Sequence, residues 1–496
     1  MVGARTHRKL MAVTNNPHLA GHDALQSNGL PSNGAVPVLP TRIEERGAVS
    51  YWVGLIVVAT VARVAIAFLF LDSMPLVADA LSYSEQARKL LSSFPGPTAY
   101  FWPPGTPYLL AAVYAIFNDS LVVSKAVAIV ISVMNVVLIA AFGMQVLKSV
   151  RAARLAGWIA CFYPPDLLMA GQTLSYPLTM LCLLLMACCL VAGFRTAKLR
   201  YFVFAGLALG FGSLTRPSTL AVTVVVPIAY VLFRRLDSSI SRQGRWQLPA
   251  ALVTFVVAAA VCVLPVMSHN FKHGAGWTLS TNNEWNFFLG NNRYTPLYKT
   301  GHFGQRSLQQ LEPEVGAYFR GFLNRPDARS AMMKEAVQYI REHPFITMWR
   351  TLNRTRAFWG FDHTMARQIQ YFYGFGNLRL VPLLVAEAGG YCLVMLSILA
   401  ALICARDQLQ AATTAFVLLL VLGYQWPHSL AFASSVYHVP VMGLLLPFAA
   451  ASVEKWRTSK STSLWPRGNA TLWLAFALFS LVQIEYGYYL LSLAPA

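Results

Sequence analysis

Runs of about 20 apolar residues recur from Tyr51 almost to the end of this 496-residue chain, and short polar loops separate them. A helix of about 20 residues crosses a hydrocarbon layer roughly 30 Å thick. The runs are too many to be anchors of a soluble domain. Hydrophobic residues make up 56% of the chain and charged residues only 12%, unlike a soluble domain of this size. The sequence therefore predicts an α-helical polytopic membrane protein.

We expect about 11 transmembrane helices. The expected spans are 51–71, 121–147, 153–171, 174–194, 201–215, 218–233, 249–268, 378–403, 410–424, 438–452 and 470–492. Residues 1–50 are polar and contain no apolar stretch that could form a signal-peptide core. We interpret them as a disordered cytoplasmic tail that precedes an uncleaved first span.

The net charge of +19 carries information about topology. With the N-terminus inside, basic residues gather in the loops that then face the cytoplasm, as the positive-inside rule requires. These residues are Lys148, Arg151, Arg154, Arg195, Lys198, Arg200, Arg234, Arg235, Arg242, Arg245, Lys455, Arg457, Lys460 and Arg467. No nucleic-acid partner is expected. All 7 cysteines lie in or at the ends of apolar runs, without zinc-ligand spacing or a disulfide framework.

Two regions are expected on the extracytoplasmic side. The first, 72–120, contains a polar helical stretch and a short apolar helix over 107–117, which we expect to lie along the membrane surface. The second, 269–377, is a loop rich in Asn, Gly, Tyr and Arg that we expect to be folded. The expected organisation is a transmembrane catalytic core over 51–268, this loop domain, and a C-terminal transmembrane bundle over 378–496.

Asp79 lies just beyond the first span. A carboxylate near the bilayer can be a solvated loop charge or a helix cap. It can also be a general base that takes the proton of an acceptor hydroxyl while that oxygen attacks an anomeric carbon. Partial desolvation near lipid would raise its pKa toward a useful range. Position alone leaves these interpretations open.

Three arginines are candidates for binding the phosphate of a donor. Arg216, in Leu214-Thr215-Arg216-Pro217, lies at an expected outer turn, where an arginine near hydrocarbon is costly unless it is paired or solvated. A guanidinium fits phosphate well, but headgroup binding or a salt bridge equally explains it. Arg350 and Arg354 precede Phe358 in a stretch that could form an amphipathic helix, and they attract a lipid phosphate or anionic headgroups.

Amide side chains and aromatic rings alternate in the second outer region, in Ser280-Thr281-Asn282-Asn283-Glu284-Trp285 and in Gly290-Asn291-Asn292-Arg293. Amides hydrogen-bond sugar hydroxyls, and aromatic faces stack on sugar rings. A set of Asx turns explains the same composition.

The ordered set of these segments resembles the GT-C superfamily of membrane glycosyltransferases, in the group of the protein O-mannosyltransferases and the lipid A aminoarabinose transferase. The resemblance covers about residues 51–450 and rests on five elements in the family's order. They are Asp79 with Tyr83, Trp102-Pro103-Pro104-Gly105-Thr106-Pro107, Leu214-Thr215-Arg216-Pro217, the Asn-rich segments followed by Glu342-His343-Pro344, and Tyr437-His438-Val439-Pro440.

The resemblance implies a glycosyltransferase that moves a sugar from a polyprenyl phosphate donor to a lipid, glycan or protein acceptor, with inversion. Asp79 corresponds to the family's catalytic aspartate. The residues expected to bind substrate are Tyr83, Trp102, Asn282, Asn283, Glu284, Asn291, Asn292 and His438.

Two departures from the family pattern concern the acceptor side. Many relatives have a glutamate where this chain has Ser175-Tyr176-Pro177, and an arginine where it has Val436. Asp166 is our candidate for the second acidic group. No metal site is assigned, since no closely spaced Asp pair is present and divalent cation use differs among relatives.

Other functions remain open. A transporter or lipid flippase would share the spans, although we find neither internal repeats nor mid-membrane ionisable residues typical of one. A non-catalytic scaffold of the same fold, or a polymerase or ligase acting on diphosphate-linked glycans, are further alternatives. A bacterial cytoplasmic membrane, with the site on the extracytoplasmic side, is the expected location.

Overall fold

The computed structural model describes residues 42–237, 247–297, 312–459 and 469–493, and all further structural statements concern these residues. The chain divides into two compact units, residues 1–48 and 49–496. Of the first unit only the beginning of helix α1 is described, so the expected tail lies mainly outside the described residues.

The described residues are helical, with no strand among them, as expected for an α-helical membrane protein. The helices before the second outer region are α1 (Arg42–Ala65), η1 (Ile66–Phe70), α2 (Asp79–Ser92), α3 (Gly105–Phe117), α4 (Leu121–Val146), α5 (Val150–Cys161), α6 (Pro164–Met169), α7 (Ser175–Thr196), α8 (Leu199–Thr215), η2 (Pro217–Ala221), α9 (Val222–Leu236) and α10 (Gln247–Lys272).

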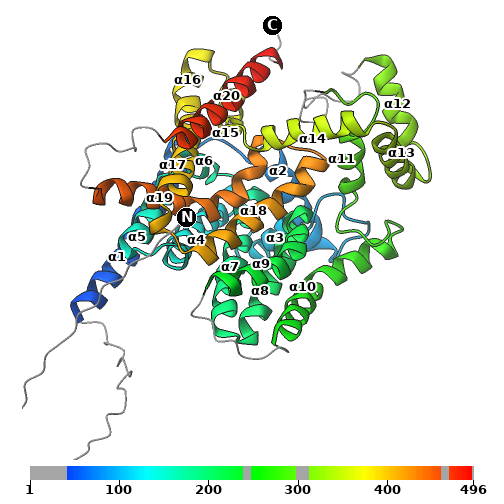
Figure 1. Cartoon of the computed structure of the whole chain (residues 1–496). Coiled ribbons are helices and arrows are strands. Elements are labelled where there is room, and N and C mark those ends of the chain that lie inside the picture. Colours follow the sequence, from blue (N-terminus) through cyan, green and yellow to red (C-terminus); the bar gives the residue numbers. More distant parts are fainter. Residues whose placement is uncertain (1–41, 238–246, 298–311, 460–468, 494–496) are drawn as a thin grey trace, which may run out of the picture. The chain divides into compact units, whose positions relative to one another are not determined.

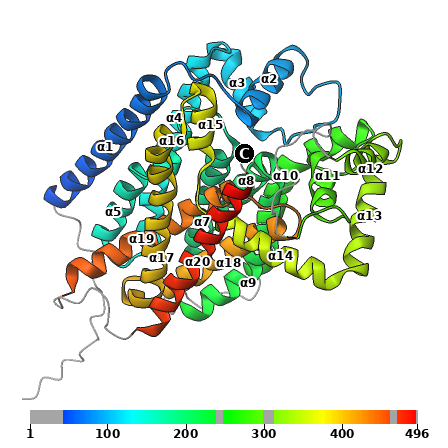
Figure 2. The same ribbon diagram turned by 90° about the horizontal axis from the view of Figure 1, so that it is seen from above.

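Five helices follow in the second outer region and eight more elements close the described chain. They are α11 (Asn282–Gly290), α12 (Pro313–Leu323), α13 (Ala328–Glu342), α14 (Pro344–Phe358), α15 (Thr364–Tyr373), α16 (Asn377–Leu384), η4 (Val385–Gly389), α17 (Gly390–Cys404), η5 (Arg406–Gln408), α18 (Ala411–Leu430), η6 (Ser435–His438), α19 (Val439–Thr458) and α20 (Ala470–Leu493). Figures 1 and 2 show α7, α8 and α10 side by side, and α17 beside α20.

Eight helical segments of the described chain are long and apolar enough to cross a membrane: 49–70, 121–146, 175–196, 217–236, 249–272, 377–404, 435–458 and 470–488. The expected spans 153–171, 201–215 and 410–424 are not among them. The first is broken between α5 and α6, where Pro164 follows Tyr163 and Pro disfavours a helical residue before it. The second expected span corresponds to α8, which is short, with 17 residues. The third is the apolar first part of α18, whose last turns are polar. The number of crossings therefore stays a prediction.

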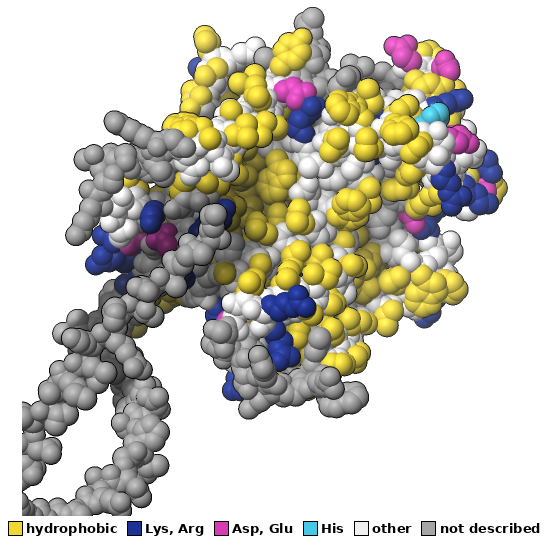
Figure 3. All heavy atoms as spheres, viewed as in Figure 1, with side chains coloured by type: hydrophobic (Ala, Val, Ile, Leu, Met, Phe, Trp, Pro, Cys, Tyr) yellow, Lys and Arg dark blue, Asp and Glu magenta, His cyan; other side chains and the backbone are white. Residues whose placement is uncertain are grey.

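Much of the surface shown in Figure 3 is hydrophobic, which suits contact with lipid. On α10, for example, Val253, Val257, Val261 and Leu264 are spaced as one helical face and are all exposed. Charged side chains gather instead over α12 and α13 in the same view.

The expected outer regions contain the helices that surround the site. Helix α2 begins at Asp79 and α3 covers the expected short apolar helix. In the second region, α11, α12 and α13 share a small core that includes Phe288, Phe319 and Met332. The boundaries expected for the domains stay a prediction.

Candidate active site

Arg216 lies at the junction of α8 and η2, at one end of the helical hairpin formed by α7 and α8. Helix α8 ends here because Pro217 follows, and Arg216 itself is extended, with φ −147° and ψ 113°. Its guanidinium packs against the rings of Tyr176 and Tyr437, 4.5 Å from each centroid, and the two ring centroids are 6.1 Å apart. One of its nitrogens donates to Oγ of Ser175 at 3.2 Å. Its buried Nε has no hydrogen-bond partner among the described residues.

Asp79 is the first residue of α2 and lies close to Arg216. Burial raises the pKa of Asp79, and the nearby positive charge of Arg216 opposes that rise. The position at a helix N-terminus also favours a carboxylate. No direct ion pair joins the two side chains in the described structure. A carboxylate and a guanidinium thus lie near each other without neutralising one another by contact.

Tyr83 is on the same face of α2, one turn after Asp79. It is buried, and its hydroxyl donates to Oγ of Ser175 at 3.4 Å. Burial raises the pKa of Tyr83 to about 12, so this hydroxyl keeps its proton at neutral pH. Ser175 therefore connects Tyr83 to Arg216, and the role of Tyr83 in substrate binding stays a prediction.

The two outer regions meet beside this site. The Thr281 N–H donates to the carbonyl of Tyr100 at 2.9 Å, and the Asn282 N–H to that of Phe101 at 3.2 Å. Trp102 packs against the apolar cluster that contains Tyr83. Asn282 is 9% exposed and Asn283 is exposed. Among the amides expected to bind substrate, Asn283 has the freest access to solvent.

Arg350 and Arg354 point into the protein from α14. Arg350 donates to the carbonyls of Asn292 and Thr295. Arg354 donates to the carbonyl of Leu430, at 2.6 Å, and to that of Gly290. Both are buried. These contacts fasten the turn after α11 to α14 and to the end of α18, and they favour a structural role over phosphate binding.

The remaining outer candidates are engaged in internal contacts. Asn291 donates its amide to the carbonyls of Phe287 and Leu430, each at 3.0 Å. Asn292 donates to the carbonyl of Phe288 at 2.8 Å. Glu284 forms an ion pair with Arg329. The Asn292 side-chain oxygen also accepts from the Tyr294 N–H at 2.9 Å, which is an Asx turn, the alternative that the sequence left open. The ion pair of Glu284 was not expected.

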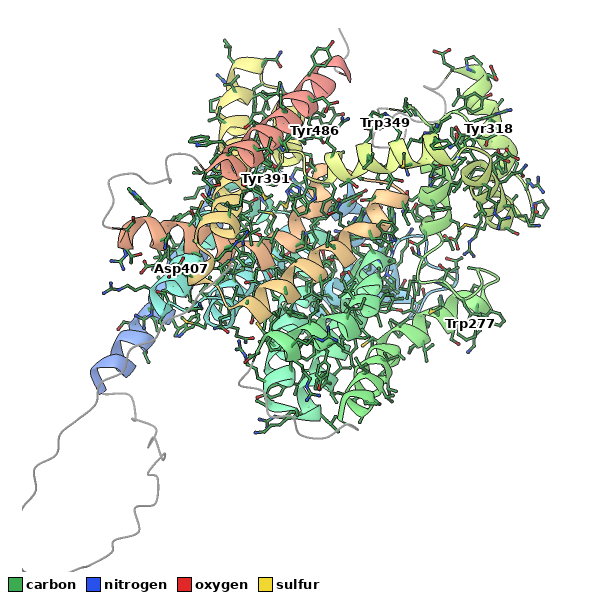
Figure 4. All side chains as sticks on the ribbon, viewed as in Figure 1. Trp277, Tyr318, Trp349, Tyr391, Asp407 and Tyr486 are labelled. Atoms are coloured by element: carbon green, nitrogen blue, oxygen red, sulfur yellow. The ribbon has the colours of Figure 1, made fainter. Side chains whose placement is uncertain are left out.

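His438 is fully buried, which argues against direct substrate contact. Its Nδ1 is 2.7 Å from the carbonyl of Phe358, and its Nε2 is 3.1 Å from Oδ2 of Asp362. Its ring stacks on that of Tyr391, with 4.4 Å between the centroids. Tyr391 comes from α17 and is labelled in Figure 4. The neighbouring residue Tyr437 is the one that reaches Arg216.

Asp166 lies in a separate buried network. Its Oδ2 is 2.7 Å from Arg63 of the first span and 2.6 Å from Oγ of Ser132. Arg63 is completely buried and also donates to the carbonyl of Cys161 at 3.2 Å. The carboxylate therefore balances an arginine inside the bundle, and this favours a structural role over a catalytic one.

Three site residues, Ser175, Tyr176 and Tyr437, were not among the expected ones. The first two stand at the position of a family departure, and Tyr437 precedes His438 in a motif that the sequence did single out. No local pattern indicated that tyrosine rings from α7 and η6 both pack against the guanidinium of Arg216. No group of three or more His, Cys, Asp and Glu that could hold a metal ion occurs among the described residues.

A family match agrees with the resemblance that the sequence pattern shows. No curated protein sequence matches this chain. A crystal structure of ArnT from Cupriavidus metallidurans bound to undecaprenyl phosphate is similar, with 13% sequence identity, a TM-score of 0.40, and coverage of 80% of this chain and 78% of that one. The stretch from Trp102 through Arg216 to His269 carries the sequence resemblance: residues 102–269 match the family model of the dolichyl-phosphate-mannose-protein mannosyltransferases.

Proposed function

We propose that this protein is a membrane glycosyltransferase that moves a sugar from a polyprenyl phosphate to an acceptor hydroxyl outside the cytoplasm. Asp79 is the general base, Arg216 binds the phosphate of the donor, and the sugar is transferred with inversion. Tyr83 and Tyr437 border the reacting groups. The donor class is supported by the family match over 102–269.

The observation that carries the proposal is that Asp79 lies close to Arg216 at one end of the bundle. The donor's leaving group is a phosphate with a negative charge, so it needs a cation beside it. The acceptor hydroxyl needs a base on the opposite side of the anomeric carbon. The unpartnered Nε of Arg216 leaves a donor for a phosphate oxygen.

The packing of Arg216 suits a lipid-linked anion. Two tyrosine rings pack against the guanidinium on adjoining sides, and a planar guanidinium presents its hydrogen-bond donors in a fork that matches phosphate oxygens. The rings reduce access of water, which strengthens the interaction between the two charges. An amphipathic donor can place its tail among the spans and its headgroup at this arginine.

The test uses purified protein with a panel of polyprenyl phosphates carrying hexoses, pentoses or amino sugars, and membrane extract as acceptor. We expect the wild type to consume one donor, and Asp79→Asn to lose at least about 100-fold in kcat because the base is gone. The matched control is Asp72→Asn, an exposed carboxylate at the end of the first span, which should leave kcat unchanged.

Arg216→Gln tests the phosphate site independently. It should raise KM for the donor and lower kcat, while Arg88→Gln, an exposed arginine that pairs with Asp119, should do neither. A folded Asp79→Asn enzyme with normal turnover would contradict the base assignment. A wild type that consumes no donor would favour the transporter or scaffold alternatives.

A further inference from the structure

Asp79 is presented by a strained turn. Ala78 has φ 48° and ψ −124°, and the Ala80 N–H donates to the carbonyl of Val77 at 3.1 Å. These are the features of a type II′ turn from Val77 to Ala80, in which the second residue has positive φ and is usually glycine. An alanine persists in this conformation only when its surroundings hold it there.

Gln172 is the residue that holds this turn. It lies in the link between α6 and α7 and is 1% exposed. Its Oε1 accepts a hydrogen bond from the Val77 N–H at 3.0 Å, and its Nε2 donates to the carbonyl of Pro75 at 2.9 Å. A carboxamide provides both a donor and an acceptor, so it can bind two backbone groups of one segment in a single orientation.

The other end of the same segment is held as well. Lys125, on α4 and 1% exposed, donates from Nζ to the carbonyls of Ala67, Leu71 and Asp72, at 2.9, 2.6 and 3.1 Å. Its three N–H groups thus bind three carbonyls at the end of the first span. The segment that leads to Asp79 therefore starts from a fixed point, and Gln172 sets its direction just before the turn.

We propose that Gln172 is a positioning residue for Asp79: by binding Pro75 and Val77 it keeps Ala78 in the turn conformation and so keeps the Asp79 carboxylate beside Arg216. The proposal rests on the proposed function, in which Asp79 is the base. Without Gln172 the segment relaxes to an unstrained conformation, and the carboxylate moves away from the reacting atoms.

The first measurement is hydrogen–deuterium exchange of the purified full-length protein over residues 74–80. Gln172→Met keeps the length of the side chain but removes both hydrogen bonds, and we expect exchange at Val77 to rise roughly tenfold. The matched control is Thr173→Val. Thr173 is the next residue in the chain, and its buried hydroxyl has no hydrogen-bond partner among the described residues.

The second measurement is turnover with the donor that the wild type consumes. Gln172→Met should lower kcat by about 10- to 100-fold with little change in KM for the donor, since a displacement of about 1 Å can cost 100-fold. Thr173→Val should match the wild type. In an Ala78→Gly background the loss caused by Gln172→Met should be clearly smaller, because glycine adopts the turn without strain.

Unchanged exchange in Gln172→Met would overturn the proposal, and so would faster exchange with unchanged kcat. An equal loss in the alanine and glycine backgrounds would show that the strained turn is not what Gln172 maintains. If the wild type consumes no donor, the proposed function fails and the catalytic role of Gln172 fails with it. The exchange data would then still decide whether Gln172 holds the turn.

Discussion

At the scale of single residues, the environment of Asp79 lowers stability through the same rise in pKa that its proposed role as a base would use. Burial raises the pKa of this carboxyl, so the folded protein binds the proton more tightly than the unfolded chain does. The contribution to stability is present below the unfolded pKa and is lost as pH rises through the folded pKa. At neutral pH the ionised carboxylate is therefore a net cost.

Asp79→Asn should consequently be more heat-stable than the wild type at pH 7 to 8 while being inactive. The gain should be small, because the side chain is half-buried and Arg216 offsets part of the penalty. It should vanish as pH falls toward the ordinary range of aspartate. Thermal unfolding in detergent across pH, with Asp72→Asn as control, measures this. A lower unfolding temperature at neutral pH would contradict it.

In the proposed function, the raised pKa of Asp79 also sets the pH dependence of turnover. A base must be deprotonated, and the raised pKa of Asp79 places the acidic limb of the kcat/KM profile above the ordinary pKa of an aspartate. Activity should therefore rise with pH through that limb. Arg216→Gln removes the charge that lowers the Asp79 pKa, so its acidic limb should move to higher pH. A shift to lower pH would show that Arg216 does not face the base.

For Asp166 we expect the opposite of Asp79, namely a loss of stability without a loss of turnover when the carboxylate is removed. Removing its charge leaves Arg63 buried without its ion-pair partner, so Asp166→Asn should destabilise the protein by about 3–5 kcal/mol. Turnover per folded molecule should stay close to that of the wild type. The double variant Arg63→Met, Asp166→Leu should recover most of the stability, as apolar replacement of a buried pair often does. Loss of kcat in a stable Asp166→Asn protein would restore the catalytic hypothesis.

At the scale of elements, one glycine lets the first outer region approach Arg216. A Cβ added to Gly105, at the start of α3, would lie 2.6 Å from the carbonyl carbon of Leu214 in α8. Gly105→Ala should therefore push α3 away and cost about 1–3 kcal/mol. It should also lower kcat, because the displaced backbone adjoins Arg216. Gly54→Ala is the control, since nothing lies within 4 Å of its Cβ and α1 should gain from it.

Sequence periodicity predicted where helices lie better than it predicted whether a long helix is continuous. The expected polar helix from Asp79 and the apolar helix before Phe117 are present as α2 and α3. The expected span 153–171 is instead divided into α5 and α6. Pro164 gives the reason, but a proline inside an apolar run can also kink a continuous helix, and the choice depends on tertiary packing.

At the scale of the whole molecule, part of the candidate site was predictable because some of its groups are conspicuous where they stand. Asp79 and Arg216 are charges next to apolar runs, which are rare and costly. Ser175, Tyr176 and Tyr437 lack such a signal, because their role comes from the meeting of α7, α8 and η6. Likewise, Arg350 and Arg354 resembled phosphate ligands until the structure placed the carbonyls of the 290–295 turn against them.

The number of crossings also belongs to this scale, and contacts at the helix ends bear on it. Arg216, at the end of α8, bonds to Ser175 at the start of α7, so α8 runs back over the depth of α7. The N–H of Gln410, the residue before α18, donates to the carbonyl of Val146 at the end of α4, and α18 ends at Leu430 beside Arg354. Helices α5 and α6 together connect the end of α4 to Gln172, next to Val77.

If α8, α18 and the pair α5–α6 also cross the membrane, the number of crossings is odd, whereas the eight candidate spans alone give an even number. Parity decides on which side the end of α20 lies relative to the start of α1. We expect opposite sides, with the end of α20 on the side of Asp79. A dual topology reporter fused after Leu493 should therefore give the extracytoplasmic signal, and one inserted in the turn at Ala197 the cytoplasmic signal. If the reporter after Leu493 lies in the cytoplasm while that at Ala197 does too, α5–α6 crosses and either α8 or α18 fails to cross.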